Sequence, residues 1–347
     1  MPTPTPAQLR QITNQQQRLM LGAFNSIIAD IRDSVVLQEL VFALERGNVN
    51  AALDLLQLDP ATWQPMEEAL REAYRTGGVT GAAQIGTVPT TTGTLAMRFN
   101  VRNPAAEQWL ATNSSRMITE IVEPTRETVR QVLTQGLAQG RNPRSVALDV
   151  IGRVNRTTRR REGGFIGLTE QQAGWVSNAR EELESLNPNY LNRQLRDRRL
   201  DGVVSRAIRD GKPLTAAQID TAVTNMQNRA LKYRGDTIAR TESLNALRSG
   251  QADAVSQAIE QGEVDQRDVL KAWIDTGQDG STRESHIQAG IDYAEGIPFD
   301  QPFIVGGEPL MYPGDPQGSA AETINCRCQL RTVINFGGRV RRIEGFS

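Results

Sequence analysis

The chain has 347 residues, of which 38% are hydrophobic and only 5% aromatic, a length that accommodates two or three domains with buried cores. Its 39 lysines and arginines nearly balance 40 aspartates and glutamates, so bulk charge predicts neither a nucleic-acid-binding nor a membrane-binding protein. No run of about 18 apolar residues and no apolar signal core occur, so we expect no membrane contact and folding in the cytoplasm of the cell that makes it.

The first 75 residues predict helices, which we interpret as an N-terminal assembly arm. Apolar side chains recur there at the three-to-four spacing of one helical face: Leu21, Phe24, Ile27, Ile28 and Ile31. Residues 76–103 change character, because five glycines are mixed with threonines. This composition predicts a flexible linker or an extended arm between two folded parts.

Residues 104–262 predict a helical body. Pro124 is expected to kink or split its first long helix. Two capping boxes, at Thr169 to Gln172 and at Thr215 to Gln218, predict the starts of two further helices, because each pairs a threonine oxygen with a third-position N–H. Gly235 is expected to end the second of these helices, and a last helix follows it.

Residues 263–347 predict a small, loop-rich α+β module with a basic tail. Glycine and proline become frequent, and short extended segments lie between them, at Leu270 to Asp275, Phe303 to Val305 and Cys328 to Phe336. The predicted fold class is therefore a mostly α-helical body with a small α+β C-terminal module.

The C-terminal module holds the only histidine, His286, and the only cysteines, Cys326 and Cys328. Imidazole and two thiolates are ligands that zinc prefers, and Asp275 or Asp279 could complete a tetrahedron. This grouping predicts a possible zinc site. Two neighbours spaced Cys-x-Cys bridge poorly, so no disulfide framework is expected.

Two other interpretations of these residues stay open. In one, His286 hydrogen-bonds a turn while two reduced thiols pack beneath it. In the other, Cys326 is a nucleophile that His286 activates. The alternative function for this module is therefore a metal-assisted or cysteine hydrolase.

Several motifs in one order resemble the phage Mu F-like head-morphogenesis family, over roughly residues 105–336. In the C-terminal module these motifs are Trp273-x-Asp275, Thr282-Arg283-x-x-His286 and Asn325-Cys326-Arg327-Cys328. Upstream of it they are Ile166-Gly-Leu-Thr169-x-x-Gln172, Lys212-Pro-Leu-Thr215 and Ala239-Arg240-Thr241-Glu242. One departure is that Thr323-Ile324 precedes Asn325, where members of the family often carry histidine or proline.

The resemblance implies a structural minor capsid protein of the virion and not an enzyme. Members associate with the portal protein and the major capsid protein, and act in head assembly, DNA packaging or DNA ejection. We therefore expect multiple copies in the phage head near the portal.

Arg240, Glu242 and Arg283 are expected to be structural anchors, with Arg240 holding the loop between Asp275 and His286. Arg240 and Glu242 are two residues apart on a helix, so they should not pair with each other. An arginine plus a glutamate could also suggest ADP-ribosyl transfer, but the serine-rich strand of such enzymes is missing.

Two arginine clusters could contact DNA phosphates. The denser comprises Arg153, Arg156, Arg159, Arg160 and Arg161, and the second comprises Arg193, Arg196, Arg198 and Arg199. Acidic neighbours dilute both clusters, and no aromatic residues interleave with them. Either a solvated or protein-facing surface or non-specific DNA contact is expected.

Overall fold

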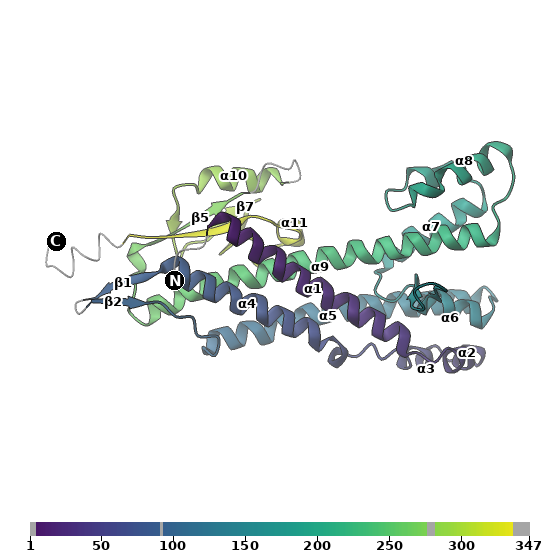
Figure 1. The fold of residues 1–347 in the computed structure, drawn as a ribbon, viewed down its shortest axis with the longest axis horizontal. Coiled ribbons are helices and arrows are strands. Elements are labelled where there is room, and N and C mark those ends of the chain that lie inside the picture. The colour runs from purple at the N-terminus through teal and green to yellow at the C-terminus, as the bar shows by residue number, and fades with distance from the viewer. Residues whose placement is uncertain (1–4, 91–92, 276–281, 336–347) are drawn as a thin grey trace. The chain divides into compact units, whose positions relative to one another are not determined.

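The computed structural model describes residues 5–90, 93–275 and 282–335, which divide between two compact units (Figure 1). Unit 1 comprises residues 1–22, 66–115 and 237–347, and unit 2 comprises residues 23–65 and 116–236. The described residues are mostly helical, with short antiparallel strands and loops in the C-terminal region. The predicted fold class is thereby confirmed.

Three long helices contribute to both units: α1 (Pro6–Ser34), α5 (Pro104–Ala138) and α9 (Ala216–Glu260). The division therefore differs from the expected boundaries near residues 75, 103 and 262. The helix end predicted at Gly235 is also wrong, since α9 continues through it, and α5 continues through Pro124 without the split that was one of the two outcomes expected there.

Unit 2 contains most of the shorter helices. They are α2 (Leu37–Glu45), α3 (Val49–Asp54), α6 (Pro143–Ile151), α7 (Glu170–Glu184) and α8 (Asp201–Asp210), with short 3-10 helices at Pro60–Trp63, Pro188–Asn192 and Arg198–Leu200. A small hairpin joins β3 (Arg153–Val154) to β4 (Arg161–Glu162). One core cluster lies under α7, α8 and the first part of α9, and includes Val176, Tyr190 and Met226.

The helix starts predicted from capping residues are confirmed. Thr169 and Gln172 form the reciprocal capping box at the start of α7. Gln218 donates its N–H to Thr215 and accepts from the Thr215 N–H, at 3.3 Å and 2.8 Å. These helix starts depend only on residues three apart, so they can be predicted from the sequence.

In unit 1, three of the five glycines expected in a linker, Gly77, Gly78 and Gly81, belong to helix α4 (Gln64–Ile85), which packs closely on α9. A Cβ atom on Gly77 would lie 2.0 Å from the Leu247 carbonyl oxygen, and one on Gly250 would lie 2.1 Å from the Tyr74 carbonyl oxygen. Small residues here allow two backbones to approach closely. The linker prediction was wrong for residues 76–85, because local composition does not distinguish a close helix crossing from a loop.

After α4 the chain forms a hairpin of β1 (Thr87–Thr90) and β2 (Gly93–Ala96) before α5 begins. Val88 is fully buried in a small cluster with Val255, Val264 and Val269. The extended character predicted for this segment is therefore confirmed only for the hairpin.

The C-terminal module is built on a three-stranded antiparallel sheet in the order β6–β5–β9. Its elements are a 3-10 helix at Gln266–Asp268, β5 (Val269–Ile274), α10 (Glu284–Asp292), β6 (Ile297–Pro298), β7 (Phe303–Val305), β8 (Glu308–Leu310), α11 (Ala320–Thr323) and β9 (Gln329–Ile334). Gly306 and Gly307, both with positive φ, make the two-residue turn between β7 and β8. Phe336 and the basic tail lie outside the described residues.

Candidate metal centre

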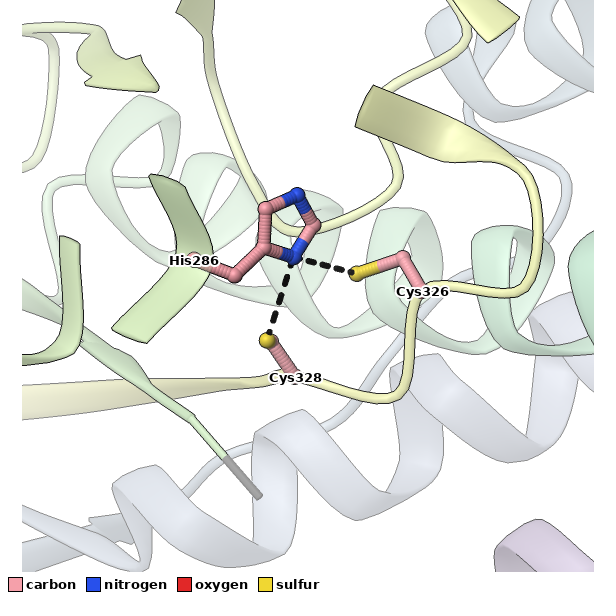
Figure 2. Close-up of side chains that lie close together, drawn as sticks. All are labelled: His286, Cys326 and Cys328. Atoms are coloured by element: carbon pink, nitrogen blue, oxygen red, sulfur yellow. Dashed lines mark hydrogen bonds between the residues drawn. The ribbon is translucent and has the colours of Figure 1, made fainter. Parts of the chain in front are cut away.

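His286, Cys326 and Cys328 meet in the core of the C-terminal module. The Nδ1 atom of His286 lies 3.4 Å from the Cys328 sulfur and 3.7 Å from the Cys326 sulfur (Figure 2). All three atoms lie within 4.8 Å of one another. Each side chain is almost fully buried, since the exposed fractions are 1%, 2% and 1% for His286, Cys326 and Cys328. The predicted grouping of these residues is therefore present in space.

A carboxylate fixes the orientation of His286. The residue sits in the first turn of α10, and its Nε2 atom lies 2.9 Å from Oε2 of Glu322, in α11. Ser285 donates its hydroxyl to the same oxygen, at 3.0 Å. With Nε2 carrying the proton toward a carboxylate, Nδ1 presents its lone pair to the two sulfurs. This tautomer is assigned from the partners of the ring.

Two further contacts hold this arrangement. Trp273, fully buried in β5, meets the His286 ring edge-on at 5.3 Å between centroids. Gly306 leaves room for the carboxylate, because a Cβ there would lie 2.3 Å from Oε1 of Glu322. The β7–β8 turn and α11 thus meet at the residue that orients the histidine.

The turn that carries the cysteines is held from helix α9 and from the start of α10. Arg240 donates to the side-chain oxygen of Asn325 at 2.9 Å, and the Thr241 hydroxyl accepts the Asn325 backbone N–H at 3.0 Å. Asn325 adopts a left-handed conformation, with φ of 59°. Arg283 donates to the Ile324 carbonyl at 2.5 Å. These contacts fix the backbone just before Cys326.

Arg248, also on α9, completes the anchoring. Its guanidinium is buried and donates to the carbonyls of Cys326 and Pro313, at 3.0 Å and 3.1 Å. A buried cation that satisfies two backbone acceptors is strongly held. It also adds positive charge beside the thiols.

The two thiols share their protons unequally. Hydrogen bonding from Cys328 lowers the pKa of Cys326, and the charge of Arg248 lowers it further. Hydrogen bonding to Cys326, together with burial, raises the pKa of Cys328. The surroundings thus favour negative charge on at least one sulfur.

The other predicted site residues have different places. Asp275 is not part of the group: its carboxylate packs against Gly290, where a Cβ would lie 2.2 Å from Oδ2. Asp279 lies outside the described residues. Glu242 is buried on α9, with 7% of its surface exposed.

Arg240 was expected to hold the loop between Asp275 and His286; the structure shows it bonded to Asn325, and Arg283 bonded to Ile324, in the turn before Cys326. Glu322, Ser285 and Arg248 were not identified from the sequence. No spacing rule marks them, because their contacts join segments that are 36 to 78 residues apart.

The denser arginine cluster forms the β3–β4 hairpin of unit 2. The side chains of Arg156, Arg159 and Arg160 at its tip are exposed and make no ion pair or side-chain hydrogen bond among the described residues. At its base, Arg153 pairs with Asp149 and Arg161 donates to the Gly152 carbonyl. The five arginines therefore divide into three that face solvent and two that hold the hairpin.

The second cluster is largely neutralised by its own neighbours. Three of its four arginines make two-point contacts with carboxylates: Arg193 with Glu182, Arg196 with Asp201, and Arg199 with Asp197. The hydrogen bond from Arg199 lowers the pKa of Asp197 to about 2. Most of this cluster is thus occupied within the protein.

No protein-family model, curated protein sequence or solved structure matches the chain. The resemblance described above therefore depends on the motif residues alone. Among the residues that the structure covers, no helix is long and apolar enough to cross a membrane.

Proposed function

We propose that the chain is a structural minor head protein of a tailed phage. In this role it associates in multiple copies with the portal protein and the major capsid protein, and acts in head assembly, DNA packaging or DNA ejection. The observation that carries the proposal is the meeting of the motifs on which the resemblance rests. Arg240 and Thr241 of one motif, and Arg283 of a second, bond to the turn that opens the Asn-Cys-Arg-Cys motif. Residues that matter for one shared fold are expected to meet in this way.

Burial of the cysteine and histidine side chains favours a structural module over the alternative, a metal-assisted or cysteine hydrolase. A hydrolase needs a nucleophile beside a cleft, or a metal position open to substrate. Cys326 and His286 are 2% and 1% exposed. They are enclosed by Trp273, Phe303 and other members of one core cluster. This burial supports a structural role over that of a nucleophile that must meet a substrate.

Non-specific DNA contact is a second candidate function, and the β3–β4 hairpin favours it. Arg156, Arg159 and Arg160 present three unpaired guanidinium groups on a short protruding turn. Such groups bind phosphates without reading bases. This contact would suit a protein that lies near the packaged genome.

Association with the portal can be tested by a surface substitution in the predicted assembly arm. Removing residues 1–103 is unsuitable, because it would uncover the face of α9 on which Gly77 and Gly81 pack. Phe42 in α2 is 59% exposed, which is unusual for a large apolar side chain and typical of an interface. Ile291 in α10 is 65% exposed and lies outside the arm.

We expect Phe42→Asp to abolish co-purification of the full-length chain with its portal protein, and Ile291→Asp to leave it intact. Circular dichroism should show both variants folded. If the unsubstituted chain fails to co-purify with portal or capsid protein, the proposed function is wrong. If Ile291→Asp alone abolishes binding, the portal-binding surface lies outside the predicted assembly arm.

A further inference from the structure

We propose that Cys326, Cys328 and His286 bind one zinc ion that locks the C-terminal module, with Glu322 orienting the histidine. The two sulfurs and Nδ1 of His286 supply three protein ligands to the ion. This inference concerns the stability of the module and is independent of the proposed role in the phage head.

The distances fit a tetrahedral zinc ion. Bonds of about 2.3 Å to sulfur and about 2.0–2.1 Å to nitrogen, at the tetrahedral angle, separate the sulfur and nitrogen atoms by about 3.6 Å. The two separations in the protein are 3.4 Å and 3.7 Å, on either side of this value. The same nitrogen faces both sulfurs (Figure 2). The three atoms are thus spaced as ligands around one centre.

Hydrogen bonding alone explains this geometry less well. A neutral imidazole whose Nε2 carries the proton has a single lone pair on Nδ1. That lone pair can accept one good hydrogen bond, yet both sulfurs of Cys326 and Cys328 approach it. A cation between the three atoms would satisfy the nitrogen and both sulfurs together.

The residues around the three ligands match those that support metal sites. Histidine ligands commonly donate their second N–H to a carboxylate, which fixes the tautomer and strengthens the ligand. Glu322 occupies that position at 2.9 Å, and Ser285 donates to the same carboxylate oxygen.

Charge also balances. Two thiolates neutralise the divalent ion, while buried Arg248 offsets Glu322. Thiolate and imidazole ligands favour zinc over calcium or magnesium, which prefer oxygen.

Such an ion would join segments that lie 40 residues apart. His286 belongs to α10, whereas the cysteines precede β9, which pairs with β5 at the centre of the sheet. All three ligands are buried in the module core. Because metal bound only by the native state stabilises that state, the ion would add directly to the stability of the module.

The first test uses the full-length protein, reduced and treated with a strong chelator, then returned to zinc or cobalt(II). We expect about one zinc per chain, a lower melting temperature after chelation and its recovery on reloading. Cobalt should give the near-ultraviolet absorption of thiolate ligation and the visible bands of a four-coordinate ion. Both thiols should react with an alkylating reagent only after chelation. A folded chain that takes up no zinc, or cobalt spectra without thiolate absorption, would overturn the proposal.

Two matched carboxylate substitutions test the orienting role. Glu322→Gln should weaken zinc binding by about 10- to 100-fold, because the histidine loses its charged partner. Glu308→Gln is the control: Glu308 accepts the Ser319 N–H at 2.6 Å in the same module but has no contact with His286. Its zinc affinity should be unchanged.

Equal affinities for the two variants would show that Glu322 does not orient the ligand. Cys326→Ser with Cys328→Ser should abolish binding. If that double variant does not fold, the cobalt spectrum of the unsubstituted chain still decides the thiolate ligands. Retention of zinc by a folded double variant would contradict the ligand assignment.

Discussion

Arginine side chains have opposite roles in the turn before Cys326 and at the tip of the β3–β4 hairpin. Arg240 and Arg248 on α9, and Arg283 just before α10, donate hydrogen bonds to oxygens of residues 313–326. These bonds hold the backbone of the turn. At the hairpin tip, arginines face solvent without a partner among the described residues. The same residue type therefore stabilises a fold in one unit and presents charge in the other. Burial and neighbouring acceptors make the difference.

The largest expected effect comes from replacing the buried arginine of the turn. Arg248→Met should lower the free energy of unfolding by about 3 kcal/mol or more, because two buried carbonyls lose their donor. Arg160→Met at the hairpin tip should change it by less than about 0.5 kcal/mol. Urea unfolding of the two variants measures the contrast. A similar loss in the free energy of unfolding for both variants would show that the arginines at the turn and at the hairpin tip do not differ in their contribution to stability.

For DNA binding we expect the opposite, namely that substitutions at the hairpin tip have the larger effect. Replacing Arg156, Arg159 and Arg160 with alanine should reduce the salt dependence of duplex binding by up to about 3 units of logarithmic slope, and weaken binding on the order of 100-fold at about 0.1 M salt. Stability should be unchanged, since these exposed side chains make no ion pair or side-chain hydrogen bond among the described residues. Fluorescence anisotropy with random duplexes at several salt concentrations measures both quantities.

The control for this effect is Arg196→Ala, because the guanidinium of Arg196 is already paired with Asp201 in the second cluster. It should leave DNA binding nearly unchanged. If binding does not depend on salt, or if the triple variant binds as tightly as the unsubstituted chain, the hairpin does not contact DNA.

The second cluster gives the smallest effect and a dependence on pH. The pKa of Asp197 is about 2, below its usual value of 3.8, so its ionised form is favoured in the folded chain. The stability it contributes is present above about pH 4 and is lost as the pH falls through about 2. Asp197→Asn should therefore cost about 1 kcal/mol at pH 7, a modest value because Arg199 is largely solvent-exposed.

Thermal unfolding between pH 7 and pH 2 measures this contribution. The difference between the variant and the unsubstituted chain should shrink below pH 4 and vanish near pH 2. Asp210→Asn, on the exposed end of α8, is the matched control and should have little effect at any pH. A constant difference across the range would show that the Asp197 charge does not contribute.

The sequence by itself determined the local features of this protein. The capping boxes at Thr169 and Thr215 and the helical class follow from residues three or four apart, which interact whatever the rest of the chain does. The grouping of His286 with Cys326 and Cys328 was also predictable, because these are the only residues of their kinds and they fall in one module.

Only the tertiary structure decided which side chains surround these features. Gly77 and Gly250 look like linker or breaker residues until α4 is seen against α9. Glu322 becomes the partner of His286, and Arg248 the anchor of Cys326, only after α10, α11 and α9 come together. Likewise, nothing in the composition separates the paired arginines near Asp197 from the unpaired ones at the hairpin tip. Contacts between distant segments depend on how the whole chain folds, and a local sequence pattern does not determine that.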